Sequence, residues 1–182
     1  WNVCTKYIIW YAGSGIYHDA TEQFMDAHLM VQEPIRYVEA FQKAGADYVT
    51  VHLEACEDVK TTLDKIHACG MKAGLAVNPE TDVKELVPYL EDVEMILIMS
   101  VHPGFGGQKF IPESLDKIRE VRAMLNEKNL EIDIQVDGGI YVENVREVLD
   151  AGANVIVAGS ACVQRRCRGK YCKFMEILKS YE

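Results

Sequence analysis

Two short motifs place a titratable side chain directly after or within an apolar run. His28 lies in His28-Leu29-Met30, and Asp137 follows an apolar run and precedes Gly138 and Gly139. A histidine at such a position can bind a metal ion or carry a proton, and a carboxylate can act as a metal ligand or a general base. Each motif also has an ordinary interpretation, because single histidines are often hydrogen-bonded in cores and Asp-Gly pairs are common in turns.

Two further motifs are rich in glycine and could bind an anion. The sequence Pro-Gly-Phe-Gly-Gly-Gln at 103–108 has three glycines within four positions, and Gly159-Ser160 follows another apolar run. Backbone N–H groups of glycine can approach a ligand closely, and the last loops of parallel α/β barrels bind phosphate in this way. A plain turn remains the alternative for either motif alone.

The elements that must position these motifs alternate between strand and helix. The expected strands are 25–29, 48–52, 72–76, 95–99, 132–136 and 155–158. The expected helices are 34–44, 58–69, 82–90, 112–127, 142–151 and a last one near 174–179. This alternation predicts a parallel sheet, and six units predict a (β/α)8 TIM barrel that lacks the first two strand–helix units. All four motifs then lie at the carboxyl ends of strands, where such barrels have their active sites.

Two joints between helix and strand share a sequence. Ala-Gly-Ala-Asp at 44–47 and Ala-Gly-Ala-Asn at 151–154 each place a glycine after a helix and Asp or Asn before a strand. Glycine suits the left-handed cap of a helix, and Asp or Asn suits the turn that follows.

Composition and charge restrict the possible functions. The chain has 182 residues, of which 49% are hydrophobic, and a formal net charge of -9. We expect one domain over 1–182 with an atypical segment at 1–23, and neither a nucleic-acid nor a membrane partner. The six cysteines lack Cys-x-x-Cys spacing and favour reduced thiols in a cytoplasmic protein. The basic stretch 162–172 could bind an anion, but an unpatterned surface segment is the preferred interpretation.

Together the four motifs resemble the ribulose-phosphate 3-epimerase family, over about residues 20–161 and again at 174–178. The resemblance implies a barrel of the ribulose-phosphate-binding type. It also implies interconversion of D-ribulose 5-phosphate and D-xylulose 5-phosphate, by metal-assisted proton transfer at C3 through an enediolate. The alternatives are a related hexulose-phosphate 3-epimerase and a catalytically inactive phosphosugar-binding remnant.

The resemblance assigns roles to individual residues. It implies that His28 and Asp137 bind a divalent cation (Zn, Fe, Mn or Co) and that Asp137 is also an acid/base carboxylate. The partner would be a small phosphorylated ketose, and a homo-oligomer is possible. His102 stands where the family usually has Asn. The residues expected to contact substrate are His28, Met30, Met99, Gly104, Phe105, Gly106, Gly107, Asp137, Gly138, Gly139, Gly159 and Ser160.

Part of the family's machinery has no counterpart in this sequence. The second acid/base Asp, two further metal ligands and a substrate-binding Ser belong to the family's first two strands. His18, Asp19 and Asp26 do not match those motifs, so impaired activity is expected. Segments 1–17 and 162–172 can each be encoded by a choice of synonymous codons that, when read one base later, encode a sequence like that of the family. We interpret both as frame-shifted translation and expect 1–17 to lie outside the barrel pattern.

Overall fold

Seven strands form one parallel sheet in chain order in the computed structural model, which describes residues 7–8, 24–104, 107–159 and 168–181. The strands are β1 (Tyr7–Ile8), β2 (Met25–Leu29), β3 (Tyr48–His52), β4 (Lys72–Val77), β5 (Met95–Met99), β6 (Asp133–Asp137) and β7 (Val155–Val157). All six predicted strands are present, which confirms the alternation predicted from apolar runs.

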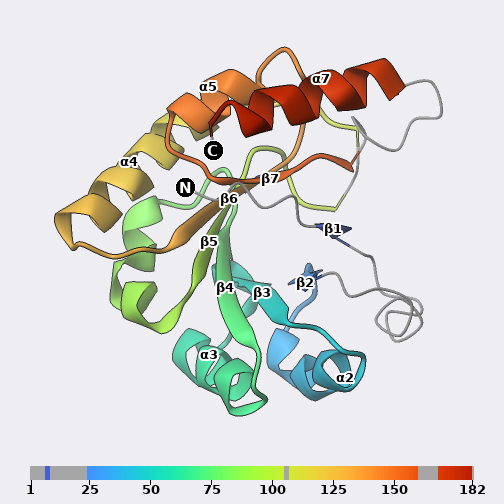
Figure 1. Cartoon of the computed structure of the whole chain (residues 1–182). Helices are drawn as coiled ribbons and strands as arrows, with labels where there is room; N and C mark the ends of the chain where they lie inside the picture. The colour runs from blue at the N-terminus through green and yellow to red at the C-terminus, as the bar shows by residue number, and fades with distance from the viewer. Residues whose placement is uncertain (1–6, 9–23, 105–106, 160–167, 182) are drawn as a thin grey trace.

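Helical segments connect consecutive strands from β2 to β7 and surround the outer side of the sheet (Figure 1). Parallel neighbours need such crossovers, because a tight turn cannot return the chain to the same end of the sheet. The helical segments are η1 (Pro34–Arg36), α2 (Val38–Lys43), η2 (Leu53–Ala55), α3 (Val59–Ala68), η3 (Val83–Asp92), α4 (Ser114–Glu127), α5 (Val145–Asp150) and α7 (Arg168–Lys179). Among the described residues, none of these helices has the length and apolar character needed to cross a membrane.

Two expectations about local structure were wrong in detail. The segment expected as an α-helix at 82–90 is the 3₁₀ helix η3, which contains Pro88. Proline lacks the N–H that an α-helix needs and clashes with the carbonyl four residues earlier. Residues 1–17 also do not lie wholly outside the sheet, because Tyr7–Ile8 pairs with β2 in parallel. A two-residue edge strand needs backbone pairing alone, so the missing apolar period did not exclude it.

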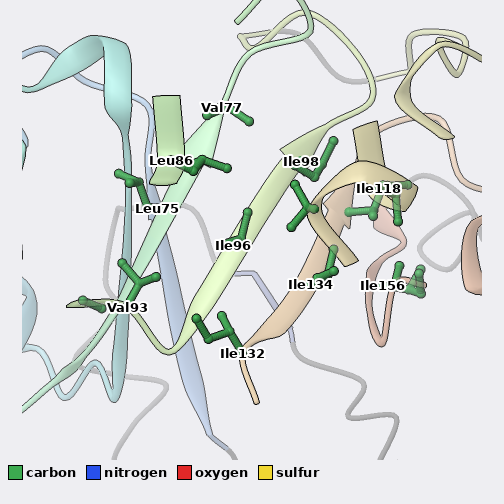
Figure 2. Packing of buried hydrophobic residues seen from close by; sticks show 14 of the residues in the cluster. Leu75, Val77, Leu86, Val93, Ile96, Ile98, Ile118, Ile132, Ile134 and Ile156 are labelled. Carbon is green, nitrogen blue, oxygen red and sulfur yellow. The ribbon is translucent and has the colours of Figure 1, made fainter. Parts of the chain in front are cut away.

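The main core lies between the sheet and the helices. Outward-facing side chains of β4, β5 and β6 are fully buried and pack beside those of η3 and α4 (Figure 2). Successive residues of a strand point to opposite faces, so the outward positions form one apolar surface. They include Leu75, Val77, Ile96, Ile98, Ile134 and Val136.

The inward face is more polar and is arranged in layers. At the amino ends of the strands, Tyr48, Met95 and Val155 form a small apolar cluster. In the next layer, Gln135 Nε2 donates a hydrogen bond of 2.9 Å to Asp26 Oδ2, and both residues are buried. This bond joins β2 to β6 across the interior, between strands that are not neighbours in the sheet. The layer at the carboxyl ends contains His28, His52, Met99 and Asp137.

Side chains at the amino ends of the strands bind the backbone of the preceding strand. Asp47 Oδ2 accepts a hydrogen bond of 2.8 Å from the N–H of Met25. Glu94 Oε2 does the same for Ala73 at 2.8 Å, and Asn154 Oδ1 for Ile134 at 2.7 Å. We call Asp47, Glu94 and Asn154 the amino-terminal rim. Each satisfies a backbone donor at the point where a strand begins.

Candidate active site

A cavity of about 230 Å³ opens at the carboxyl ends of the strands. Parallel barrels place their reactive groups at this end, because the loops that follow the strands meet there. The predicted site residues that line the cavity are His28, Met30, Met99, Gly104, Gly107, Asp137, Gly138, Gly139 and Gly159. Phe105, Gly106 and Ser160 lie outside the described residues, as do His18 and Asp19.

His28 is held by β2 with its ring pointing into the barrel interior. Its side chain has no exposed surface, and Nδ1 lies 3.8 Å from Asp137 Oδ2. Within the described part of the chain, this nitrogen has no hydrogen-bond partner. Burial lowers the pKa of His28 to about 3, with a smaller contribution from His52. The ring is therefore neutral at physiological pH, as a metal ligand must be.

Asp137 is the last residue of β6, and its side chain is 25% exposed. Burial raises the pKa of its carboxyl group to about 6; His52 opposes this shift and Asp26 adds to it. A carboxylate with a pKa near the working pH can both accept and return a proton, which general acid–base catalysis requires. Asp26 itself lies in the layer below, where it accepts a hydrogen bond from Gln135, and it does not line the cavity.

The gap between His28 and Asp137 suits a divalent cation. Nitrogen and carboxylate ligands about 2.0–2.2 Å from a zinc ion would lie roughly 3.4 Å apart at a tetrahedral angle. The observed separation of 3.8 Å is close to this value, and the buried Nδ1 otherwise has no partner among the described residues. The same residues contain no group of three or more His, Cys, Asp or Glu that could hold a metal ion. Because of their separation and the nitrogen that no described residue binds, His28 and Asp137 fit as two of the ligands of a cation site.

A second histidine at the end of β3 completes the polar cluster. His52 Nε2 lies 2.8 Å from His28 Nε2, with the ring centroids 4.9 Å apart and the ring planes inclined by 23°. On its other side, His52 Nδ1 lies 3.5 Å from Glu54 Oε2. The motif analysis did not identify either residue. The signal was present, because His52 ends a predicted strand just as His28 lies near the end of another.

Glu54 is anchored by the loop that follows β4. Its Oε1 accepts a hydrogen bond of 2.8 Å from the N–H of Asn78 and another from the hydroxyl of Thr81. Burial raises the pKa of Glu54, but hydrogen bonds from His52, Asn78 and Thr81 outweigh it and lower the pKa to about 2. The carboxyl group is consequently an anion and acts as an acceptor alone.

The two glycines after Asp137 allow two loops to pack closely beside the cavity. A Cβ atom on Gly138 would lie 2.4 Å from Val101 Cγ2, and one on Gly139 would lie 2.4 Å from the backbone nitrogen of Phe110. Gly139 also has a φ of 64°, which side chains disfavour. Ser100 Oγ donates to the carbonyl of Gly138 at 2.7 Å and fixes this turn against β5. Glycine is therefore required here.

Comparison with known proteins places these features in a family. The model of the ribulose-phosphate 3 epimerase family matches residues 15–163. The chain is 46% identical to a ribulose-phosphate 3-epimerase of Bacillus subtilis over 151 residues, which cover 82% of this chain and 70% of that relative. It is 52% identical to one of Synechocystis over 143 residues, which cover 78% of this chain and 62% of that relative. The chain thus spans roughly two thirds of the length of such relatives.

The fold is shared more widely than the sequence. A 3-hexulose-6-phosphate synthase of Salmonella typhimurium superposes with a TM-score of 0.70 at 22% identity, covering 93% of this chain and 79% of that one. This similarity shows that the two chains share a fold, in which parallel strands alternate with helices as in a (β/α) barrel. The family match leaves residues 1–14 and 164–182 outside it. Those stretches contain most of the two segments interpreted as frame-shifted, and that interpretation stays a prediction.

Proposed function

The chain belongs to the ribulose-phosphate 3-epimerase family, and from this membership we propose that its cavity binds a phosphorylated ketose and takes part in epimerisation at C3. The substrates are D-ribulose 5-phosphate and D-xylulose 5-phosphate. One observation carries the proposal: a buried His28 nitrogen faces Asp137, whose carboxyl pKa is raised to about 6, at the edge of the cavity.

Asp137 serves as the acid/base group on one face of the substrate. Its carboxylate removes the proton from C3 and leaves an enediolate, whose planar carbon can accept a proton from either face. Return of a proton on the opposite face inverts C3 and completes the reaction. In the family, that second proton transfer belongs to an Asp on the first strands, which the described residues do not include.

A divalent cation, with His28 and Asp137 among its ligands, would stabilise the negative charge that develops on the substrate oxygens. His28 contributes a neutral, buried nitrogen, and the ring is held in position by the hydrogen bond between its Nε2 and His52 Nε2. Met99 closes the inner wall of the cavity, where it is 2% exposed and excludes water. The candidate ions are Zn, Fe, Mn and Co.

The loops after β6 and β7 supply the phosphate site in this proposal. Gly138, Gly139 and Gly159 line the cavity, and Ser160 follows them in the chain. Backbone N–H groups in glycine turns can surround a phosphate without side chains in the way, and a serine hydroxyl adds a donor. This half of the site is independent of the cation ligands, so substrate can bind where turnover is slow.

Binding without efficient turnover is the second candidate function. It is favoured because the described residues present two cation ligands and one acid/base carboxylate at the cavity, fewer than the chemistry needs. A polypeptide of these 182 residues should therefore turn over ribulose 5-phosphate many orders of magnitude more slowly than the Bacillus relative. One lost stabilising group alone lowers rates by about 10²–10³.

The test is to purify the chain and measure two quantities with each of the four metals added in turn. Turnover of ribulose 5-phosphate is followed by formation of xylulose 5-phosphate, and sugar-phosphate affinity by calorimetry. A six-carbon ketose phosphate, assayed in parallel, tests the hexulose-phosphate alternative. Saturable binding with weak, metal-dependent turnover supports the proposal. Absence of any sugar-phosphate binding would refute it.

A further inference from the structure

We infer that His52 and Glu54 set the tautomer of His28, so that His28 Nδ1 faces Asp137 without a proton and is free to bind a cation. The two residues act through His28 and are positioning residues. The inference rests on the proposed function, because this tautomer serves catalysis only if a cation binds to His28 and Asp137. The hydrogen-bond pattern that it predicts can be measured without any cation or substrate.

The two histidine rings share one hydrogen bond. The Nε2 atoms of His28 and His52 are 2.8 Å apart, which is a hydrogen-bond distance between two ring nitrogens. Each neutral imidazole has one N–H donor and one acceptor nitrogen. One proton therefore lies between the two rings, and either His28 or His52 donates it.

Glu54 decides between the two possibilities. Its carboxylate accepts and cannot donate, and it lies 3.5 Å from His52 Nδ1. The N–H of Asn78 holds the carboxylate in this place. An anion beside Nδ1 favours the tautomer that carries its proton there. His52 Nε2 is then the acceptor, and His28 must donate from its Nε2.

The surroundings of His28 Nδ1 agree with this result. A proton on His28 Nδ1 would face Asp137 Oδ2 at 3.8 Å, beyond hydrogen-bond distance, whereas Glu54 Oε2 lies nearer to His52 Nδ1, at 3.5 Å. That proton would be buried without a partner among the described residues, which costs about 1–3 kcal/mol. An unprotonated Nδ1 instead directs a lone pair toward Asp137, into the space that a cation can occupy. Partners beyond the ligands orient metal-binding histidines in this way in many proteins.

The direct test is nuclear magnetic resonance of the whole metal-free chain with ¹⁵N-labelled histidine. Long-range proton–nitrogen correlations show which ring nitrogens carry protons. We expect a protonated Nε2 and an unprotonated Nδ1 for His28, and a protonated Nδ1 for His52. A proton on His28 Nδ1 would overturn the inference, whatever the activity of the protein.

The second test is the affinity for Co²⁺, measured by titration of the same chain. Replacing a partner behind a ligand weakens metal binding by about 10–100-fold. His52→Phe removes the acceptor for His28 and should weaken Co²⁺ binding by a factor within this range. His52→Gln keeps a carbonyl acceptor and should recover most of the loss. Glu54→Gln, at a partly exposed position, should lose about 10-fold and tests the pair if His52→Phe does not fold.

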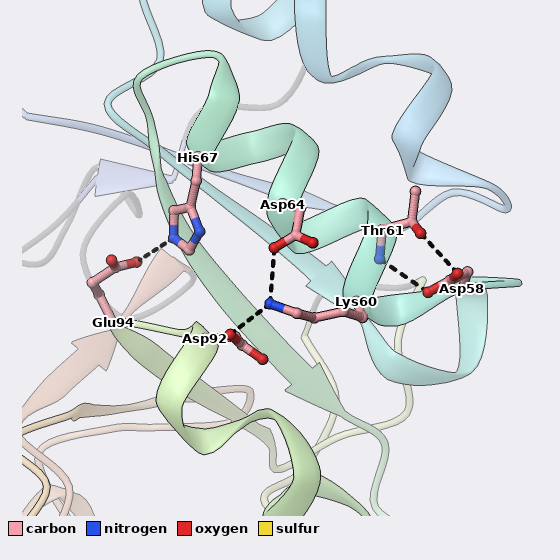
Figure 3. Close-up of polar contacts among 7 residues, drawn as sticks. All are labelled: Asp58, Lys60, Thr61, Asp64, His67, Asp92 and Glu94. Atoms are coloured by element: carbon pink, nitrogen blue, oxygen red, sulfur yellow. Dashed lines mark hydrogen bonds and ion pairs between the residues drawn. The ribbon is translucent and has the colours of Figure 1, made fainter.

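The matched control is His67→Phe. His67 forms a comparable pair, with Nε2 3.2 Å from Glu94 Oε2, on the outer surface (Figure 3). This variant should bind Co²⁺ like the parent, and unchanged binding by His52→Phe would contradict the inference. If the parent binds no Co²⁺ while the predicted tautomers are observed, the cation site of the proposed function fails and the tautomer assignment stands.

Discussion

The two ends of the parallel sheet satisfy their polar side chains differently. At the amino-terminal rim, Asp47, Glu94 and Asn154 each accept a hydrogen bond from the first residues of a neighbouring strand. At the carboxyl end, His28 Nδ1 is buried and has no such partner within the described residues. One end thus uses its polar groups to hold strands in register, and the other keeps one nitrogen available for a ligand.

The same residue pair occurs at both ends with different consequences. His67 and Glu94 form a hydrogen-bonded pair on the surface, where both side chains are more than a third exposed (Figure 3). His52 and Glu54 form the other pair, in which the His52 ring is buried against His28. Exposed pairs contribute roughly 0–1 kcal/mol because water competes with them. Burial and the neighbouring ring, and not the residue types, separate a functional pair from a surface pair.

Removing the carboxylate at the carboxyl end should have the largest effect. Asp137→Asn keeps the shape of the side chain but cannot remove a proton, so turnover should fall about 10²–10⁴-fold below that of the parent. Asp64→Asn makes the same chemical change on exposed α3 and should leave turnover unaltered. Steady-state rates with added metal compare the two. Equal rates for parent and Asp137→Asn would remove Asp137 from the mechanism.

The second largest effect is expected from a side chain placed between the two loops beside the cavity, which should destabilise the fold. Gly139→Ala forces a Cβ to within 2.4 Å of the Phe110 backbone, at a φ of 64°. We expect a loss of about 3–4 kcal/mol in the free energy of unfolding, as for other substitutions that combine backbone strain with a clash. Gly104→Ala is the control, because its φ of 116° is also positive but no atom lies within 4 Å of the added Cβ. Urea denaturation should show a loss of about 1–2 kcal/mol for this variant.

The pH dependence of the free energy of unfolding should reveal the shifted pKa values of Asp137 and His28 at the carboxyl end. The folded pKa of Asp137, about 6, lies above its ordinary value of 3.8, so its contribution to stability is lost as pH rises from 4 to 6. The folded pKa of His28, about 3, lies below 6.5, so its contribution is lost as pH falls from 6.5 toward 3. In the parent these slopes oppose each other between about pH 4 and 6.

Single variants separate the two slopes. With metal chelated, Asp137→Asn should show stability rising with pH by up to about 1.4 kcal/mol per unit more steeply than the parent in this window. His28→Gln should show the opposite change. Chemical denaturation at half-unit steps from pH 4 to 7 measures both. Parallel curves for all three proteins would show that folding does not shift the pKa values of Asp137 and His28.

The smallest effect is expected at the amino-terminal rim. Asp47→Ala removes the acceptor for the Met25 N–H and should lower the free energy of unfolding by about 1–2 kcal/mol. Asp47→Asn retains an acceptor oxygen and should restore most of it. Neither change should alter Co²⁺ affinity. A rim variant that weakened metal binding as much as His52→Phe would erase the distinction between the two ends.

The strands could be predicted from the sequence because their outward faces are apolar. Met95–Met99 is continuously apolar and buried on both faces, so its bounds were predicted to the residue. The helix at η3 was predicted, but its 3₁₀ geometry was not, although Pro88 was visible. β1 was missed because a short edge strand depends on backbone pairing with β2, which leaves little trace in side-chain patterns.

The site was predictable where its residues lie within recognisable motifs. His28 and Asp137 are far apart in the chain, yet strand-end positions predicted that they meet, and their atoms lie 3.8 Å apart. The roles of Asp47 and Asn154 in turns were also visible from the repeated joint, but their bonds to the preceding strands were not. His52 was missed because its importance comes from contacts with His28 and Glu54. Such contacts depend on side-chain direction in three dimensions.

The bond between Asp26 and Gln135 has a consequence for the kinetics of folding. Every strand pair in the sheet joins neighbours along the chain, so each can form within a local unit. Gln135 and Asp26 are 109 residues apart, and their bond requires the intervening strands to curve first. It should therefore form after the rate-limiting step. Gln135→Leu would then accelerate unfolding and leave the refolding rate nearly unchanged. The bond across the curved sheet thus slows unfolding and has little influence on the refolding rate.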